Sequence, residues 1–433
     1  MRHARWGLVA LLSATATAGY LCRVNVSVAG ALLMGEFGLS QIQMGRVFSA
    51  FLLGYALFQV PGGMLADRWG ARRVVAFVTW WWVLTTLLQA AVGWGPLGGS
   101  AAGVLWMLVA LRFVLGVGAA PTYPASAQGV ARWVPPLARG RANGIVIGSV
   151  GLGSALAPPL VSSVMVSWGW RASLLASALP ALAMAVVWLF VGEPEAGARG
   201  AGGAGTAGGA GRASGAGGAG GAPAPPPILK SPSLGLLTLS YSLQGYVGYI
   251  FVFWFYLYLV QVRHFDLLRG AFLSSLPWIL SIISIPLGGV VSDRLVRGRI
   301  GPLWGRRLVA MVGLAGSGVL ISLGARAGNA YLAAMYLALA TALVLSVEGP
   351  FWATVVEIAG PRSGTAGGIM NTGCNIGGLI SPALTPVLAA SLGWENALHV
   401  AAALSIIGAA LWLGINPARR RPAGVGPRTP GLP

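Results

Sequence analysis

Twelve long apolar stretches constrain the fold of this chain more than any other feature. They cover approximately residues 8–34, 44–66, 73–94, 101–125, 142–167, 172–192, 234–260, 268–292, 306–325, 329–358, 364–391 and 395–416. Each is long enough to cross a bilayer as a helix, which takes about 20 mostly apolar residues. None shows the two-residue alternation of a transmembrane strand, and lipid tolerates only helices and closed barrels. The sequence therefore predicts an all-α membrane protein with twelve transmembrane helices.

The scarcity of charge excludes most soluble classes of protein. Hydrophobic residues make up 56% of the 433 residues and charged residues 9%, whereas soluble domains carry about 25% charged residues. The net charge of +19 would suit nucleic acid, but the basic residues lie in the short gaps between apolar stretches. We therefore expect a lipid bilayer, and no nucleic acid, around this chain.

The sequence contains no pattern typical of an enzyme or of a cofactor site. It has two cysteines, Cys22 and Cys374, and both fall inside apolar stretches, so neither a disulfide framework nor a zinc site is predicted. We find no nucleophile–base pair, no cluster of metal-ligating residues and no phosphate-binding loop in it. The expected protein is therefore not an enzyme, and it needs no cofactor and no metal.

A change of composition divides the chain into two parts. Residues 196–227 are almost entirely Gly, Ala and Pro, which bury nothing and are typical of a linker. We therefore expect two six-helix halves, residues 1–192 and 234–416, joined by a cytoplasmic linker over 193–233 and followed by a tail over 417–433. The first apolar stretch continues past Tyr20 to Met34, which favours an uncleaved span over a signal peptide.

The basic residues also predict how the chain is oriented. Most of them, including those of the linker and of both ends of the chain, fall on one side of the predicted spans. The other side has Arg171, Arg263, Arg269 and Arg326 in its loops, and Arg46 at the edge of a span. Cytoplasmic loops carry the excess of basic residues. We therefore expect both termini and the linker to be cytoplasmic, which requires an even number of spans.

A short motif occurs at the same place in both halves. The second span ends on Gly62–Arg68 and the eighth on Gly288–Arg294, each a glycine pair, three residues, Asp and Arg. Glycines allow two helices to approach closely, and the Asp with the arginines after it could form a cytoplasmic charge relay. A six-span internal repeat is typical of transporters. The predicted gating residues are Gly63, Asp67, Arg68, Arg72, Arg73, Gly289, Asp293 and Arg294.

Several segments resemble a known family. Residues Gly63–Arg73 resemble the loop 2–3 signature of the major facilitator superfamily, and Arg112 with Gly116, Gly118, Ala119 and Ala120 resembles its fourth-span motif. Within that family the chain is similar to the anion:cation symporter group, which includes hexuronate, galactonate and phthalate transporters. The stretches that carry this likeness are 20–29, 51–61, 132–135, 348–353 and 370–378.

The resemblance has consequences for the fold and for transport. It implies two pseudo-symmetric six-helix halves around a central cavity, in a monomeric multi-pass protein of the bacterial inner membrane. It also implies transport of a small organic anion, such as a sugar acid, by alternating access. The galactonate-like members carry two proton-coupling acids, one just before the first-span Arg and one in the fourth span. Cys22 and Ala119 stand at these positions here, so the family route of proton symport is not implied.

Three ionisable residues, Arg23, Arg112 and Glu348, fall well inside predicted spans. Such a residue costs about 2.5–3.5 kcal/mol at the centre of a span, so it usually faces a cavity or a partner. Arg23 shares a helix face with Tyr20 and Ser27, and its guanidinium suits a carboxylate or phosphate. The alternative is an internal ion pair with Glu348. Arg112 could bind the anion or serve packing and conformational change.

Glu348 is the acid deepest within a span. Burial disfavours its charged form, so it could exchange a proton near neutral pH; the alternative is a salt bridge to an Arg. If an Arg held Glu348 until the anion displaced it, Glu348 could be both a salt-bridge partner and a proton carrier. Asn371 and Asn375, one helical turn apart, could bond substrate hydroxyls or tie helices together. The predicted substrate-binding residues are Tyr20, Arg23, Ser27, Tyr55, Arg112, Tyr246, Asn371 and Asn375.

The sequence favours a secondary active transporter of a small organic anion, with the proton as the candidate coupling ion. Its predicted partners are the anionic solute, protons and the lipid bilayer. A uniporter, an exchanger or an efflux carrier of another small solute stays open as an alternative. A membrane sensor that kept the fold without transporting is a further alternative of a different class.

Overall fold

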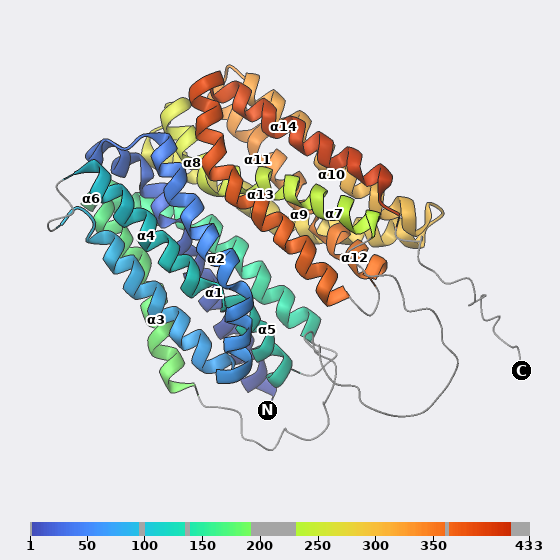
Figure 1. The fold of residues 1–433 in the computed structure, drawn as a ribbon, viewed down its shortest axis with the longest axis horizontal. Coiled ribbons are helices and arrows are strands. Elements are labelled where there is room, and N and C mark those ends of the chain that lie inside the picture. Colours follow the sequence, from blue (N-terminus) through green and yellow to red (C-terminus); the bar gives the residue numbers. More distant parts are fainter. Residues whose placement is uncertain (1, 95–99, 135–138, 192–230, 360–362, 417–433) are drawn as a thin grey trace, which may run out of the picture.

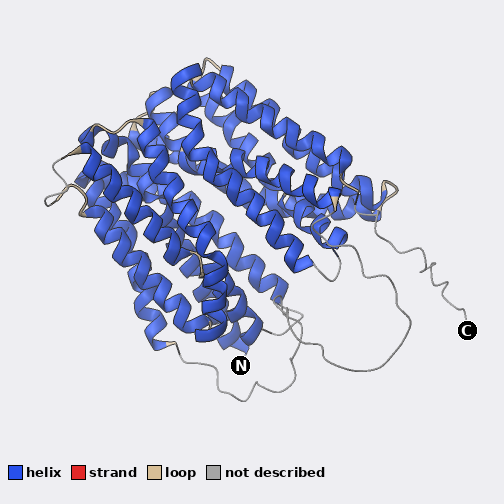
Figure 2. Cartoon of the chain, in the orientation of Figure 1, coloured by secondary structure: helices blue, strands red, loops and turns tan. Residues whose placement is uncertain are grey.

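The computed structural model describes residues 2–94, 100–134, 139–191, 231–359 and 363–416 (Figure 1). Within these ranges the chain is helical, and no strand occurs (Figure 2). The predicted tail and residues 193–230 of the predicted linker lie outside the described residues, so the domain boundaries stay a prediction.

The described residues of the first half form six helices. They are α1 (Arg2–Phe37), α2 (Gln41–Trp69), α3 (Ala71–Ala90), α4 (Ala101–Ala119), α5 (Thr122–Trp133) and α6 (Arg139–Phe190). Helices α4 and α5 follow each other across a break at Ala120–Pro121 and form one span. Helix α6 has 52 residues, or about 78 Å, more than twice the thickness of a bilayer core. It breaks at Gly169 (φ 81°, ψ 171°), so it contains the predicted fifth and sixth spans.

The second half repeats this arrangement. Its elements are α7 (Pro232–Phe253), α8 (Phe255–Leu257), the π-helical η5 (Tyr258–Val262), α9 (Leu267–Arg297), α10 (Gly301–Arg326), α11 (Ala330–Ser346), α12 (Glu348–Ala359), α13 (Ser363–Leu392), α14 (Trp394–Leu411) and η7 (Trp412–Gly414). Among the described residues, 11 helices are long and apolar enough to cross a membrane. Since Ala142–Phe190 contains two crossings, this confirms the predicted twelve-span all-α fold.

Both copies of the glycine motif lie at the same structural position. Gly62 of α2 lies against Pro121, at the break between α4 and α5. Gly288 of α9 lies against the carbonyl of Ser346, at the break between α11 and α12. A Cβ at Gly62 would lie 2.8 to 3.0 Å from Pro121, and one at Gly288 would collide with the Ser346 carbonyl. The repeated glycines are therefore the residues that let two spans cross in direct backbone contact.

The halves contact each other at the end opposite the termini. Helix α2 crosses α13 there, and Ser49 Oγ donates to the Leu379 carbonyl at 2.9 Å. Closer to that end, Gln41 Nε2 donates to Gln261 Oε1 at 2.9 Å. On the other side of the molecule α6 meets α9, where Ser162 Oγ donates to the Leu267 carbonyl at 2.9 Å.

The halves lie farther apart at the end that carries the termini (Figure 1). On this part of α2, Leu57 is 59% exposed and Val60 74%. A Cβ added to Gly144 or Gly148 of α6 would meet no other described atom within 4 Å. The structure is therefore closed at one end of the two halves and open at the end near the termini.

Candidate functional site

A small cavity of about 30 Å³ lies in the first half of the chain, next to the boundary between the halves. Its walls come from α1, α2, α3, α4 and α5, and they include Tyr20, Arg23, Phe51, Tyr55, Trp82 and Tyr123. Ala119, which stands where the resemblance expects an acid, also lines it. Among the described lining residues Arg23 is the only charged one, so the cavity is aromatic with one cation in its wall.

Arg23 connects the two halves of the molecule. Its side chain is 7% exposed. Nη1 donates to the Tyr20 hydroxyl on the same helix at 3.1 Å, and Nη2 donates to the Tyr249 hydroxyl of α7 at 3.0 Å. Within the described residues, its Nε has no hydrogen-bond partner. The guanidinium therefore touches both halves, and its Nε–H is left without an acceptor among the described residues.

Aromatic rings surround the guanidinium. Its Cζ lies 4.8 Å from the ring centroid of Phe51, 5.1 Å from that of Tyr20, 5.6 Å from that of Tyr55 and 5.7 Å from that of Tyr249. Such contacts favour a desolvated cation by about 2 kcal/mol. The Tyr20 and Tyr249 hydroxyls accept from Arg23, so each keeps its own hydrogen for another acceptor. The site thus offers several donors to one anionic group.

Arg112 lies directly behind this site. It is fully buried in α4, and its Nη2 donates to the backbone carbonyl of Arg23 at 2.8 Å. Its Cζ lies 5.1 Å from the Phe51 centroid. Its Nε and Nη1 have no partner among the described residues, and no described salt bridge joins either arginine to an acid. A buried unpaired cation costs several kcal/mol, so this arrangement favours an anion nearby.

Glu348 forms a separate site in the second half. It starts α12 and is half-buried; Oε2 accepts from the Tyr241 hydroxyl at 2.7 Å and Oε1 from Gln244 Nε2 at 3.0 Å. Tyr241 and Gln244 precede Tyr249 on α7 by five to eight residues, roughly 8–12 Å at the helical rise. The ion pair considered between Arg23 and Glu348 is absent from the described residues, and Glu348 lies nearer the open end.

The other predicted substrate residues lie in different surroundings. The Ser27 hydroxyl donates to the Val24 carbonyl at 2.6 Å and is buried, so it faces its own helix. The Tyr246 hydroxyl pairs with Thr385 Oγ1 at 3.3 Å, within the second half. Neither hydroxyl reaches the cavity around Arg23, whereas Tyr20 and Tyr55 line it.

The two asparagines of α13 lie at the boundary between the halves. Asn375 Nδ2 donates to Gln59 Oε1 of α2 at 3.4 Å. Asn371, one turn closer to the open end, is half-buried. Gln59 Nε2 in turn donates to the Tyr55 hydroxyl at 3.4 Å, so Asn375 is linked to the cavity wall through one side chain.

Tyr249, Phe51, Tyr123 and Trp82 contact the site but are not in the predicted set. The many tyrosines of the seventh span indicated that some of them face a cavity. Helical periodicity alone could not separate those that face Arg23 from those that face a neighbouring helix. Tyr249 faces Arg23, and Tyr246 faces Thr385 of a neighbouring helix.

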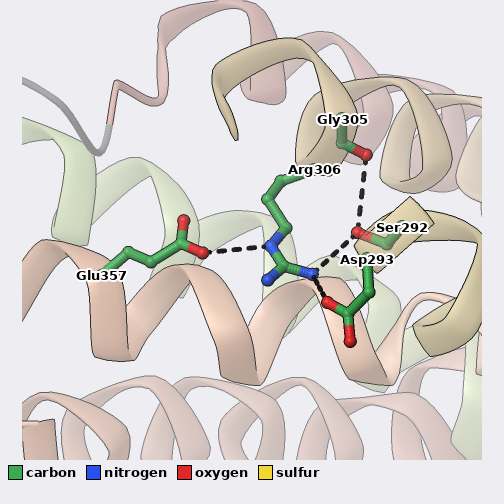
Figure 3. A network of polar contacts seen from close by, with 5 residues as sticks. All are labelled: Ser292, Asp293, Gly305, Arg306 and Glu357. Carbon is green, nitrogen blue, oxygen red and sulfur yellow. Dashed lines mark hydrogen bonds and ion pairs between the residues drawn. The ribbon is translucent and has the colours of Figure 1, made fainter. Parts of the chain in front are cut away.

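The second glycine motif ends in a charged network (Figure 3). Arg306 Nη1 of α10 lies 2.6 Å from Asp293 Oδ1 and donates to Ser292 Oγ at 3.0 Å, while its Nε lies 3.1 Å from Glu357 Oε1. Arg294, the residue predicted to act with Asp293, is exposed instead. The acid therefore pairs with an arginine of the next helix, and the network joins α9, α10 and α12 within one half.

The first glycine motif is described only in part. Arg72 Nη2 donates to the Leu189 carbonyl at the end of α6 at 3.0 Å, while Arg68 and Arg73 are exposed. The side chain of Asp67 lies outside the described part of the structure. Gly63 lies near Pro124, and Gly289 near Gly349, so both predicted glycines lie at helix crossings.

Comparison with known proteins relates this geometry to a family. The sequence profile of the Major Facilitator Superfamily matches residues 9–303 and 296–431. The chain is 32% identical over 418 residues to a probable sulfoacetate transporter of Cupriavidus necator, covering 96% of this chain and 94% of that protein. It is 28% identical over 421 residues to a hexuronate transporter of Bacillus subtilis, covering 95% and 94%.

A solved structure shows the same fold. A bacterial homologue of the human lysosomal transporter Spinster, in an inward-facing and unoccupied conformation, superposes with a TM-score of 0.73. Sequence identity is 16%, and the match covers 95% of this chain and 96% of that one. At this identity the likeness extends to the fold alone.

Proposed function

This chain belongs to the Major Facilitator Superfamily, whose members are transporters rather than enzymes, and we propose that it carries a small organic anion by alternating access. The observation that supports this most is Arg23, buried in an aromatic cavity and bonded to both halves. A carboxylate or sulfonate could take the place of the Tyr249 hydroxyl at Nη2 and form a charge-assisted pair. The substrates named for the two relatives, sulfoacetate and hexuronate, are both small organic anions.

The contacts between the halves support a rocking motion. Ser49–Leu379 and Ser162–Leu267 close one end, while the other end lies open near the termini. Rocking one half against the other would close the open end and open the closed one around a fixed site. We place the termini, and hence the open end, in the cytoplasm because the basic residues gather there. We further propose a monomer in the bacterial inner membrane.

Proton coupling is a second part of the proposal. Ala119 leaves the cavity wall without the acid of the galactonate-like transporters, and Cys22 Sγ faces the Ser177 carbonyl at 3.6 Å inside the first half. Glu348 is then the candidate proton carrier, because it is half-buried near the open end. The competing proposal is uniport or exchange without a proton.

Uptake into proteoliposomes tests the main proposal. We expect the purified chain to support saturable uptake of labelled sulfoacetate or of a labelled hexuronate, because Arg23 requires an anionic group. A neutral sugar and an amine of similar size serve as matched controls and should not enter above the level of empty liposomes. Uptake of the neutral sugar or of the amine alone would refute the anion proposal. Absence of uptake for every solute would instead favour the non-transporting sensor.

The Asp293 network is proposed to act in gating rather than in binding. Asp293→Asn removes the charge that holds Arg306, so we expect turnover to fall about tenfold, or about 1.4 kcal/mol, with substrate affinity nearly unchanged. Asp266→Asn on the same helix is the matched control, since Asp266 is exposed and Asn also caps helices well. Binding and transport are measured separately on both variants. A loss confined to affinity would contradict the gating role.

A further inference from the structure

Three neighbouring arginines lie at the turn between α9 and α10. Arg294 and Arg297 belong to the last turn of α9, and Arg299 lies in the connection before α10 begins at Gly301. All three residues are exposed. Among the described residues, none of their side chains has a salt-bridge or hydrogen-bond partner. The turn therefore presents three positive charges that no described side chain neutralises.

The acids of this region are occupied by another arginine. Asp293 and Glu357 both pair with Arg306, at 2.6 and 3.1 Å (Figure 3). Arg307 donates from Nε and Nη2 to the Ile415 carbonyl, at 2.9 and 2.7 Å. The stretch from Asp293 to Arg307 contains five arginines and no acid besides Asp293. The region thus carries a positive excess, and this excess lies on the exposed side chains of the turn.

The arginines at the closed end of the molecule are arranged differently. Arg171 and Arg269 each pair with an acid, at 2.8 and 3.1 Å. Arg263 donates to the Tyr258 hydroxyl and to carbonyls at the end of α10. Arg326, where α10 ends, is exposed. No described loop at the closed end carries three arginines in succession, so the two ends of the second half differ in what they attract.

Exposed apolar side chains border the charges of the α9–α10 turn. Ile300 is 45% exposed and Trp304 46%, and the Arg307 Cζ lies 5.4 Å from the centroid of the Trp304 ring. The span of α9 ends at Arg297 and that of α10 begins at Leu303. These residues therefore lie at the level where the spans leave the lipid, which is where Trp is enriched. Arginines at this level can hold their charge among headgroups while apolar neighbours contact acyl chains.

We propose that the α9–α10 turn binds the headgroup of an anionic phospholipid. The lipid phosphate accepts hydrogen bonds from the guanidiniums of Arg294, Arg297 and Arg299, because guanidinium and phosphate form strong charge-assisted pairs. The acyl chains lie along Ile300 and Trp304. A free phosphate would leave these two apolar side chains uncovered, so the arrangement favours a lipid over a soluble anion. None of these residues lines the substrate cavity, so the site is independent of the anion that is transported.

Binding of lipids to the full-length purified protein in a neutral detergent tests the site. Phosphatidylglycerol and phosphatidylcholine with the same acyl chains are titrated separately, and the bound lipids are counted by native mass spectrometry. We expect the wild type to bind phosphatidylglycerol more tightly than the zwitterionic lipid. The combined Arg294→Gln, Arg297→Gln and Arg299→Gln variant should bind phosphatidylglycerol about tenfold more weakly, because each basic residue adds to the attraction of an anionic headgroup.

A variant matched in charge is the control. Arg46→Gln, Arg269→Gln and Arg326→Gln together remove three exposed arginines of the closed end, and this protein should bind phosphatidylglycerol like the wild type. Equal affinity of the wild type and the α9–α10 variant for phosphatidylglycerol would overturn the proposal, and so would an equal loss in both variants, which would show an effect of net charge alone. Displacement of the lipid by an excess of inorganic phosphate would assign the turn to a soluble anion instead. Each outcome can be read whether or not the protein transports an organic anion.

Discussion

Arg23→Lys is expected to lose at least about a hundredfold in transport, equivalent to about 2.7 kcal/mol. An ammonium is a single point charge, so it cannot donate to Tyr20 and to Tyr249 from two fixed directions as the guanidinium does. It also loses most of the stacking on Phe51 and Tyr55. The loss matches the 1.5–3 kcal/mol typical of a hydrogen bond to a charged group. Uptake of the labelled anion, corrected for the amount of folded protein, is the measurement.

A matched substitution separates this effect from a general effect of replacing an arginine by a lysine. Arg269 is 70% exposed and pairs with Asp266 at the start of the same helix. It is not among the described residues that line the cavity. Arg269→Lys should transport like the wild type, since an exposed ion pair contributes little. If a well-expressed Arg23→Ala protein transported with normal rate and affinity, Arg23 would not bind the substrate.

The fold was predictable because lipid allows only helices and closed barrels to cross the membrane. Apolar length alone located each span, and the resemblance placed the halves in one family, which the profile match confirms. Breaks inside spans were harder to predict. The interruptions at Pro121 and at Val347 lie within apolar sequence, and at each of them a glycine of the neighbouring span lies against the backbone. Such a contact between distant segments leaves no local signal.

The site could be predicted only in part, for a similar reason. Tyr20 and Arg23 share a face by helical spacing, and the structure brings them together. The same spacing suggested Ser27, but a hydroxyl can bond a carbonyl of its own helix, and Ser27 does so. Tyr249 lies 226 residues from Arg23 in the chain, so its part in the site follows from the packing of the two halves.

The Asp293 network illustrates the limit for charges. The motif places Arg294 next to Asp293 in sequence, but consecutive residues on a helix point in different directions. Arg306, thirteen residues later on α10, lies across the helix pair and reaches the acid. Glu357 then joins from α12, which no spacing in the sequence indicated. The acid was identified from its motif, and its partners required the tertiary structure.

Glu348→Gln is expected to uncouple proton movement from transport. The sequence suggested that an arginine holds the acid until the anion displaces it. This arrangement does not occur among the described residues. Tyr241 and Gln244 donate hydrogen bonds to Glu348 instead. What supports coupling is position: the carboxyl group is half-buried near the open end, so it can meet water in this state and be covered when that end closes. A glutamine has the shape of the protonated acid and cannot exchange a proton.

Proton flux driven by the substrate in liposomes distinguishes the two schemes. If Glu348 carries the proton, wild-type protein should acidify the lumen when the anion is driven inward, and the Gln variant should lose that flux while it still exchanges anion. Glu395→Gln, at an exposed acid in the first turn of α14, is the control and should behave like the wild type. Equal proton flux in wild type and Glu348→Gln would assign the proton to another group. Transport by the wild type without any proton movement would replace symport with uniport or exchange.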